Sequence, residues 1–355
     1  MSSRPVKRSL SAALAAFVAI SLAGCASSGS GGAKEMAYVT AVQATLRDRM
    51  AAVYNKTGTV ANGEAVEVLE HSHNGRFARV RSSRNEEGWL EQRYLATQAV
   101  FNGFAQLGRE AATTPVQSHA VTRAELNMQL TPARDAEHLY QLKEGAKLDL
   151  LKRATTQKSG TPPVLVASSN KAGEGAPEPV YEDWWLARDE RGHTGWVLAR
   201  MVDLDVPLDV AQYAEGQRII ADFVLNTVAD GDKAVPQYLL LLNEPKDGEP
   251  QDFNQVRVFT WNTRRHHYET AYRERKLNGV LPAAVGAEDF GKEGKLPVFT
   301  IHVKDDSGQI TERKYKMNGV MVRRVVAPGE APALPERRGR KVSRVLPPSV
   351  PKKST

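Results

Sequence analysis

Cys25 carries the only thiol of this 355-residue chain, and small residues lie next to it on both sides. A thiolate with small neighbours is a nucleophile that a processing enzyme can reach. A single cysteine also excludes an internal disulfide, so the folded parts of the chain must be held by core burial alone. Cys25 is therefore the first candidate for covalent chemistry in the sequence.

The first residues have the three-part pattern of an export signal. Arg4, Lys7 and Arg8 form a basic start with no acidic residue nearby, and an apolar run follows over residues 12–23. This run is too short to span a bilayer as a stable helix. Residues 1–24 are therefore predicted to be a signal peptide.

The run ends in a tetrapeptide, Leu22-Ala23-Gly24-Cys25, that resembles a lipobox, the signature of bacterial lipoproteins. The resemblance implies cleavage before Cys25 and acylation of its thiol, with palmitate among the acyl chains. More than one acyl chain makes membrane anchoring stable. Ala26 follows where an aspartate typically marks retention, which implies the outer membrane, facing the periplasm. The alternative is a plain secretory signal followed by an incidental cysteine.

The rest of the sequence contains no recognisable catalytic constellation. With Cys25 taken by lipid, a cysteine peptidase or transpeptidase would need a second cysteine, and there is none. Histidines occur in two close pairs, His71 with His73 and His266 with His267. Neither pair has a carboxylate or a third histidine at metal-ligand spacing. The sequence therefore predicts a protein that is not an enzyme and holds no metal or other cofactor.

The net charge of +7 is carried by the two ends of the chain. The signal segment contributes +3 and residues 327–355 contribute +5, which leaves residues 25–326 with a net charge of −1. A near-neutral body has no electrostatic footprint for DNA or RNA. Nucleic acid is therefore not an expected partner.

An approximate internal repeat organises the first half of the chain. The equivalent pairs are Leu46 with Met128, Gly63 with Gly145, Gly88 with Gly195 and Trp89 with Trp196. Each copy has the alternation and turn residues of short antiparallel strands. The second copy carries an insertion at about 155–182 that is loop-like because it is rich in Gly, Pro and Ser.

Both copies resemble bacterial SH3 (SH3b) domains. The second opens with Leu-Asn-Met-Gln-Leu-Thr-Pro at 126–132, similar to the opening of that family, and the first has a shorter form of it at 44–48. Both keep the glycine turn, the aromatic-led strand and the closing Gly-Trp pair. The resemblance implies two small SH3-like barrels, at 37–97 and 121–206, and peptidoglycan as the ligand that many relatives bind.

Six aromatic residues of the two copies are candidates for contact with a ligand, because aromatic rings stack on sugar faces and peptide side chains. They are Tyr54, Phe77, Trp89, Trp184, Trp185 and Trp196. Phe77, Trp89 and Trp196 are assigned to the barrel cores. Tyr54, Trp184 and Trp185 remain as candidate ligand-binding residues. Since Trp184 and Trp185 are adjacent on one predicted strand, one should face inward and the other outward, and the outward one is favoured.

The two copies are joined by residues 98–120, which contain apolar residues at helical spacing and are predicted to include a short amphipathic helix. Those residues are Val100, Phe101, Phe104 and Leu107. Before the first copy, residues 25–36 are a Gly- and Ser-rich, flexible spacer.

Residues 209–326 resemble no known family, and their alternating apolar residues predict a third, all-β domain. Two ambiguous apolar runs, 219–228 and 238–242, are interpreted as strands joined by a turn at 230–232. Residues 327–355 are basic and rich in proline, without apolar periodicity, and are predicted to be a disordered tail.

The sequence as a whole predicts a mainly β, lipid-anchored protein of the cell envelope. Its predicted role is that of a non-catalytic binding module, with peptidoglycan as the ligand and the membrane as a partner through the N-terminal lipid. The alternative is a scaffold or assembly lipoprotein that binds another envelope protein through residues 209–326.

Overall fold

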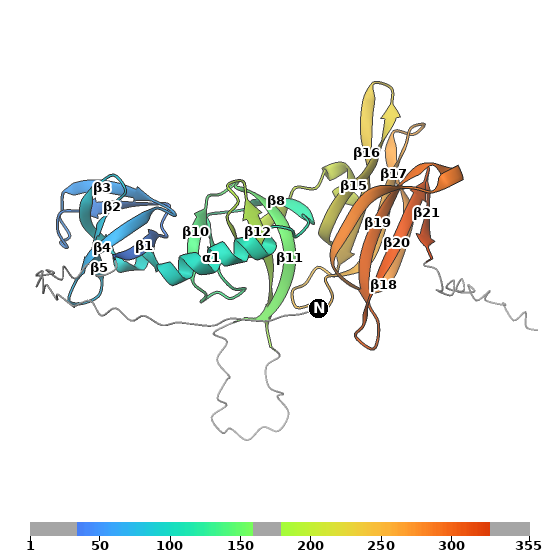
Figure 1. Cartoon of the computed structure of the whole chain (residues 1–355). Coiled ribbons are helices and arrows are strands. Elements are labelled where there is room, and N and C mark those ends of the chain that lie inside the picture. Colours follow the sequence, from blue (N-terminus) through green and yellow to red (C-terminus); the bar gives the residue numbers. More distant parts are fainter. Residues whose placement is uncertain (1–33, 159–178, 327–355) are drawn as a thin grey trace, which may run out of the picture. The chain divides into compact units, whose positions relative to one another are not determined.

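The computed structural model describes residues 34–158 and 179–326 of the chain. These residues form three seven-stranded sheets, and α1 is the one helix among them with more than two turns (Figure 1). No helix in the described ranges is both long enough and apolar enough to cross a membrane. The mainly β fold with a short helix between two barrels is confirmed.

The first sheet has the strand order β3-β2-β6-β5-β4-β1-β7. Its strands are β1 (Glu35–Val39), β2 (Gln43–Arg47), β3 (Lys56–Ala61), β4 (Ala65–His71), β5 (Phe77–Arg81), β6 (Glu87–Glu91) and β7 (Leu95–Thr97), with the 3-10 turn η1 (Gln92–Tyr94) before the last. Side chains from alternate strand positions fill its core, among them Leu46, Val60, Val66, Val80 and Leu90.

The second sheet repeats this order strand for strand, as β10-β9-β13-β12-β11-β8-β14. Its strands are β8 (Ser118–Thr122), β9 (Leu126–Gln129), β10 (His138–Leu142), β11 (Lys147–Gln157), β12 (Tyr181–Asp189), β13 (Thr194–Leu198) and β14 (Val202–Leu204), with η2 (Ala199–Met201) before the last. The two predicted barrels therefore share one topology.

A glycine at the same place in each barrel explains the Gly-Trp pair of the repeat. A Cβ added to Gly88 of β6 would lie 2.8 Å from the Cβ of Leu46 on β2. A Cβ added to Gly195 of β13 would lie 2.7 Å from the Cβ of Met128 on β9. Side chains do not approach one another so closely, so a larger residue would push the crossing strands apart.

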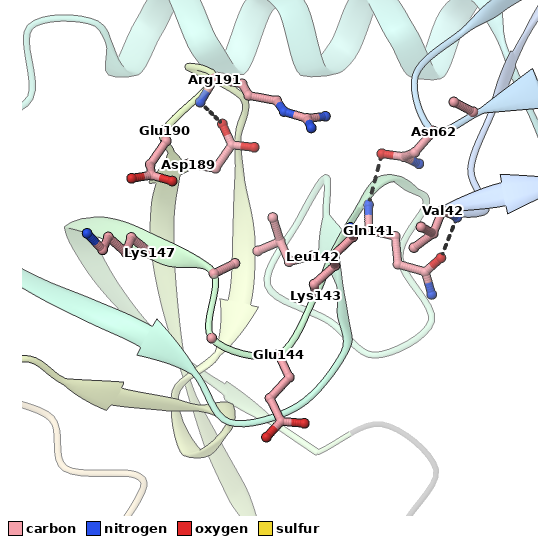
Figure 2. Close-up of a pocket in the computed structure, with 13 residues that line it drawn as sticks. Val42, Asn62, Gln141, Leu142, Lys143, Glu144, Lys147, Asp189, Glu190 and Arg191 are labelled. Atoms are coloured by element: carbon pink, nitrogen blue, oxygen red, sulfur yellow. Dashed lines mark hydrogen bonds between the residues drawn. The ribbon is translucent and has the colours of Figure 1, made fainter.

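Two side-chain amides hold the first barrel against the second (Figure 2). Asn62 Nδ2 donates to the carbonyl of Leu139 at 2.8 Å, and Asn62 Oδ1 accepts from the backbone N–H of Gln141 at 3.2 Å. In return, Gln141 Oε1 accepts from the backbone N–H of Val42 at 2.9 Å. Each amide thus bonds to a backbone group of the other barrel.

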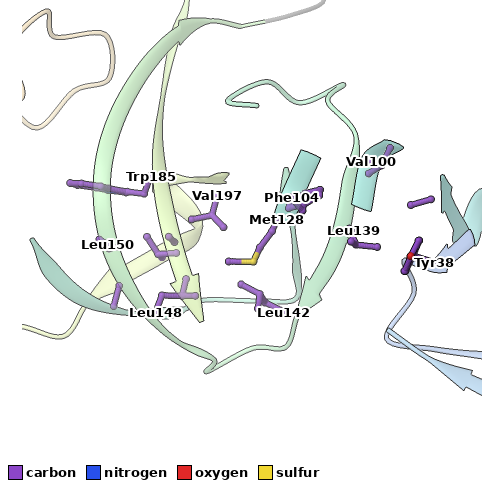
Figure 3. Close-up of a cluster of buried hydrophobic side chains, with 14 of the residues drawn as sticks. Tyr38, Val100, Phe104, Met128, Leu139, Leu142, Leu148, Leu150, Trp185 and Val197 are labelled. Atoms are coloured by element: carbon purple, nitrogen blue, oxygen red, sulfur yellow. The ribbon is translucent and has the colours of Figure 1, made fainter. Parts of the chain in front are cut away.

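Helix α1 (Gln98–Ala111) confirms the amphipathic segment predicted between the barrels. It begins at Thr97, whose Oγ1 accepts from the N–H of Val100 at 3.3 Å. Phe101 stacks on Tyr38 of β1 with ring centroids 4.0 Å apart. Val100 and Phe104 enter the core of the second barrel (Figure 3). The helix therefore contacts both barrels.

The third sheet is a meander in which each strand pairs with the next in sequence. Its strands are β15 (Arg218–Asp230), β16 (Lys233–Asn243), β17 (Phe253–Asn262), β18 (His267–Asp289), β19 (Lys295–Lys304), β20 (Ile310–Asn318) and β21 (Met321–Val325). Short helical turns precede it at α2 (Leu208–Ala211) and η3 (Gln212–Ala214), and η4 (Gly291–Glu293) follows β18. The ambiguous runs are strands β15 and β16, joined at 231–232 as predicted.

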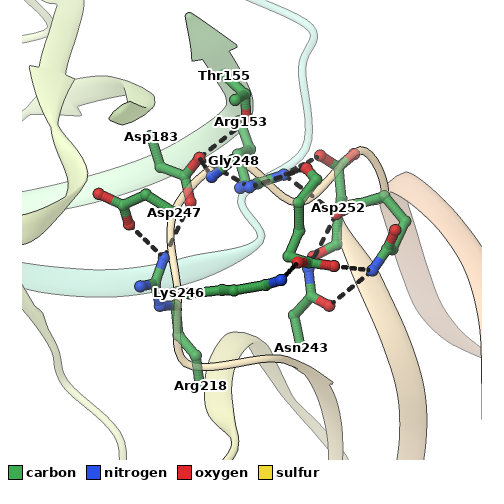
Figure 4. Close-up of polar contacts among 11 residues, drawn as sticks. Arg153, Thr155, Asp183, Arg218, Asn243, Lys246, Asp247, Gly248 and Asp252 are labelled. Atoms are coloured by element: carbon green, nitrogen blue, oxygen red, sulfur yellow. Dashed lines mark hydrogen bonds and ion pairs between the residues drawn. The ribbon is translucent and has the colours of Figure 1, made fainter. Parts of the chain in front are cut away.

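A buried ion pair on β11 and β12 joins the second barrel to the third sheet (Figure 4). Arg153 Nη2 lies 2.8 Å from Asp183 Oδ1, and their side chains are only 4% and 1% exposed. Asp183 also accepts from Arg218 of β15 at 2.9 Å and from the N–H of Gly248 at 3.2 Å. Arg153 in turn pairs with Asp252 at 3.3 Å. The buried side chains of Arg153 and Asp183 thus bind residues of both the second and the third sheet.

The strands on either side of the insertion in the second copy extend further than predicted. Strands β11 and β12 continue into it, and Thr155–Gln157 pair with Tyr181–Asp183. The Gly- and Pro-based loop prediction at about 155–182 is therefore wrong at both ends. Threonine and tyrosine fit a pleated strand well, so the hairpin lengthens before its composition changes.

Asp183→Ala should lower the free energy of unfolding by about 3–5 kcal/mol, because it leaves Arg153 buried without its closest partner. Urea unfolding of the full chain, followed by tryptophan fluorescence, measures the change. Asp203→Ala is the control, because Asp203 pairs with Arg123 where both side chains are about half exposed. The control should change stability by less than about 1 kcal/mol. Equal effects of the two variants would contradict the role given to the buried pair.

Candidate ligand-binding site

The loop between β2 and β3 is closed at its base by Asp48. The carboxylate of Asp48 accepts from the backbone N–H of Asn55 at 2.8 Å and from Asn55 Nδ2 at 3.0 Å. Arg49 Nη2 donates to the same carboxylate at 2.8 Å. These hydrogen bonds, first from Arg49 and then from Asn55, lower the pKa of Asp48 to about 2. The residues between them are therefore held as a defined loop.

This closed loop exposes apolar side chains. Met50 is 47% exposed, Val53 is 85% exposed and Tyr54 is 37% exposed. The guanidinium of Arg47 lies 4.3 Å from the ring centroid of Tyr54 and 5.8 Å from that of Phe77. We call these five residues the Tyr54 patch.

The Tyr54 patch combines ring surface, aliphatic surface and a cation. Arg47 Nη2 is held by Glu91 Oε1 at 3.1 Å, so the guanidinium under the Tyr54 ring is fixed from the other side. Aromatic faces of this kind stack on sugar rings and on peptide side chains, and a cation near them adds electrostatic attraction to polar ligands. The patch is thus built for contact with a ligand that is partly apolar.

The sequence of this barrel matches the family model of the bacterial SH3 domain over residues 44–96. Residues 44–96 are a bacterial SH3 domain. The Tyr54 patch lies on this SH3 domain, on strands and a loop inside the matched range. No curated protein sequence matches the chain.

The equivalent loop of the second barrel, between β9 and β10, is fastened to the lengthened hairpin. Arg134 Nη2 lies 2.5 Å from Glu182 Oε1, and Thr156 Oγ1 donates to the carbonyl of Pro132 at 2.9 Å. The hydrogen bond from Arg134 holds the pKa of Glu182 below its ordinary value, although burial opposes this. The loop between β9 and β10 is therefore bonded to the described ends of β11 and β12, whereas the loop of the Tyr54 patch is exposed.

None of the three aromatic residues assigned to barrel cores lies in a barrel core. Phe77 and Trp89 are half-buried and face away from the core of the SH3 domain. Side chains alternate along a strand, and Gly88 and Leu90 occupy the inward positions next to Trp89. Trp196 is buried, as expected, but it lies on the outer side of β13 in a cluster with Ala111 of α1.

The prediction that one of Trp184 and Trp185 faces outward to a ligand is wrong, because both are 3% exposed. Trp185 belongs to the buried cluster that contains Leu150 of the second barrel (Figure 3) and Ile220 of β15. Trp184 points to the opposite face, where Leu107 and Ala111 of α1 cover it. The helix thus buries the aromatic side chain that the strand alone would expose. Tyr54 is the one predicted ligand-binding residue that the structure exposes.

The histidine pairs form no metal site among the residues that the structure describes, which contain no cluster of three metal-ligating side chains. His266 lies in the turn after β17 and its Nδ1 is 2.7 Å from Asp230 Oδ2. The lipobox residues Leu22, Ala23, Gly24 and Cys25 lie outside the described residues. Residues 25–33 of the predicted spacer and the basic tail also lie outside them, whereas Glu35 and Met36, predicted as part of the spacer, belong to β1.

Several solved structures are similar to parts of the chain. NlpC2 from Trichomonas vaginalis shares 12% identity, with a TM-score of 0.16, over 51% of this chain and 54% of its own. An NlpC/P60 family protein from Bacillus cereus shares 10% identity, with a TM-score of 0.21, over 66% of this chain and 93% of its own. An NlpC/P60 endopeptidase from Photobacterium damselae subsp. piscicida shares 6% identity, with a TM-score of 0.21, over 82% of this chain and 66% of its own.

The similarity to these solved structures corrects one expectation. The sequence predicted a protein that is not an enzyme, but the structures that the chain resembles are NlpC/P60 proteins, and one of them is an endopeptidase. That prediction is therefore overturned, and the proposals below do not depend on it. At TM-scores near 0.2, the likeness assigns no catalytic residue to this chain.

The closed loop should open in acid only at a pH well below the ordinary carboxyl range. Because the pKa of Asp48 is depressed to about 2 from 3.8, its hydrogen bonds stabilise the loop fully above 3.8 and are lost as the pH falls through about 2. The amide resonance of Asn55 in an NMR titration should report this midpoint, with the methyl groups of Val80 showing that the core stays folded. A midpoint near 3.8 would show that Asp48 does not hold the loop.

Proposed function

We propose that the chain is a cell-envelope protein whose SH3 domain binds peptidoglycan through the Tyr54 patch. The observation that carries this proposal is the exposed ring of Tyr54 on a loop that Asp48 closes, inside a matched bacterial SH3 domain. Peptidoglycan presents sugar rings with apolar faces and short peptides with methyl groups, and both suit a patch of aromatic and aliphatic side chains.

The Tyr54 patch is ordered before any ligand arrives, which favours binding. Asp48 restrains both ends of its loop, and Arg47 restrains the ring of Tyr54. A ligand that binds an ordered surface loses less conformational entropy than one that must order a loop. The second barrel offers no equivalent surface in the described residues, since its loop is bound to the lengthened hairpin. The proposed site is therefore on the first barrel.

Tyr54→Ala should weaken binding to purified sacculi at least about fivefold, because a stacked aromatic contact contributes about 1 kcal/mol or more beyond its buried area. Co-sedimentation of the soluble form lacking residues 1–25 with a series of sacculus concentrations measures the affinity. The fold should not change, since Tyr54 is exposed.

Leu208→Ala and Ile310→Ala are matched controls, because they shorten apolar side chains that are 84% and 52% exposed outside the SH3 domain. They should bind sacculi like the unaltered chain. Equal binding by Tyr54→Ala would refute the proposed site. Binding to a component of an envelope lysate, with none to sacculi, would instead favour the alternative of a scaffold that binds another envelope protein.

We also propose that Cys25 anchors the chain to the outer membrane through lipid. The support is the lipobox-like sequence Leu22-Ala23-Gly24-Cys25 after a basic and apolar start. Anchoring would place the SH3 domain at the membrane that bounds the periplasm, where peptidoglycan is within reach.

Cys25→Ser should abolish lipidation, because a hydroxyl cannot replace the thiol in the acylation step. Metabolic labelling with radioactive palmitate and membrane fractionation measure the result, and the variant should carry no label and leave the membrane fraction. Ser27→Ala, two residues further on, is the control and should be labelled like the unaltered chain. Unchanged membrane attachment of Cys25→Ser would disprove the proposed anchor.

A further inference from the structure

A groove of about 470 Å³ runs along the contact between the two barrels (Figure 2). One side is formed by the turn at 142–147 and by the turn at 189–191 of the second barrel. The other side is formed by Val42, Ala61 and Asn62 of the SH3 domain. The groove therefore exists only where both barrels are in place.

The amides in this groove are already used by the protein. Asn62 Nδ2 donates to three backbone carbonyls, and Gln141 Nε2 donates to Glu125 at 2.7 Å. These bonds hold the walls in position. The amides are thus part of the framework, and recognition of a ligand falls to the other polar groups.

Five charged side chains along the groove are exposed and have no hydrogen bond or ion pair with any residue that the structure describes. Three are cations and two are anions: Lys143, Lys147, Arg191, Glu144 and Glu190. Elsewhere in the described chain, most arginines form an ion pair with a carboxylate, as Arg81 does with Glu87 at 2.7 Å. The charges of the groove therefore contribute little to the stability of the barrels.

Asp189 fixes the backbone position of Arg191 through a hydrogen bond. Burial would raise the pKa of Asp189, but hydrogen bonds from the ring of His193 at 2.9 Å and from the backbone N–H of Arg191 at 2.9 Å lower it below its usual range. The turn is thus ordered, and the side chain of Arg191 extends across the groove toward the side of Asn62 (Figure 2).

The two copies of the repeat differ in the side chain that they place at this turn. Gly63 and Gly145 are equivalent turn residues, with φ angles of +78° and +73°. The residue before the first is Asn62, which fastens the SH3 domain to its neighbour. The residue before the second is Glu144, which has no partner in the described chain. The residue at this turn therefore joins the two barrels in the first copy and presents an unpaired carboxylate in the second.

We infer that this groove is a second ligand site, for a short peptide that carries both a free carboxylate and a free amine. Arg191 and the two lysines match the carboxylate, and the two glutamates match the amine, as charge-assisted hydrogen bonds require. The inference rests on the proposed function, because peptidoglycan peptides with a diamino acid have both groups. It names a site for the peptide that is separate from the Tyr54 patch.

Isothermal titration of the soluble form lacking residues 1–25 tests the inference. The probe is the synthetic peptide N-acetyl-L-Ala-D-isoGln-L-Lys-D-Ala, whose one free carboxylate is at its C-terminus and whose one free amine is on the lysine, compared with its C-terminal amide and its ε-acetylated form. Each modified peptide should bind at least about tenfold more weakly, because each loses one charge-assisted contact. Arg191→Glu should weaken binding of the unmodified peptide by a similar factor and should not weaken binding of the amide further.

Arg264→Glu is the matched control, because it reverses an exposed arginine in a turn of the third sheet. It should bind the peptide like the unaltered chain. Absence of saturable binding by the unaltered chain, or equal losses in the Arg191 and Arg264 variants, would overturn the inference. So would loss of peptide binding in Tyr54→Ala, since it would place the peptide on the Tyr54 patch.

The two proposals fail in different ways. Sacculi that bind through Tyr54 without any binding of the soluble peptide would overturn the groove and leave the proposed function standing. Peptide binding that depends on Arg191, without binding of sacculi, would overturn the function proposed for the Tyr54 patch and support the groove.

Discussion

The buried pair of Arg153 and Asp183 is the interaction on which the arrangement of the chain depends. Burying two charges costs several kcal/mol each unless close partners and hydrogen bonds replace water. Here the partners come from two sheets, since Asp183 accepts from Arg218 and Gly248 while Arg153 also pairs with Asp252. Neither sheet satisfies these charges by itself. The second barrel and the third sheet are therefore held in one specific contact, in a chain with a single cysteine and so no internal disulfide.

The pair stands on a hairpin that only the second copy of the repeat has lengthened. In the SH3 domain the equivalent strands, β4 and β5, end at His71 and begin at Phe77. In the second copy, β11 and β12 extend to Gln157 and from Tyr181, and this extension carries Asp183 and Glu182. Asp183 binds the third sheet, and Glu182 binds the loop that would otherwise match the Tyr54 loop. The second barrel thus contacts the third sheet through this hairpin, while the first barrel exposes the proposed Tyr54 patch.

The two proposed sites lie on parts of the molecule with different chemistry. The Tyr54 patch offers apolar surface, and the groove offers unpaired charges on a rigid frame. A polymer that presents sugars and charged peptides in alternation is able to engage both. Two weak contacts on one polymer raise the overall affinity well above either alone, provided that their spacing matches.

The repeat, the shared topology of the two barrels and the helix between them were predictable from the sequence, because each depends on local periodicity and on glycines that no other residue replaces. Gly88 and Gly195 mark strand crossings where a Cβ has no room, so the repeated Gly-Trp pair can be recognised in the sequence. Of the site, only Tyr54 was predicted from the sequence, because its aromatic ring is suited to stacking on a ligand. The burial of Trp184 was not, since alternation along β12 places it on the outer face, where it packs in a cluster that includes Leu107 and Ala111 of α1. The charges of the groove become a candidate site only when two barrels meet, because whether a lysine or glutamate is paired is decided by neighbours that are distant in sequence.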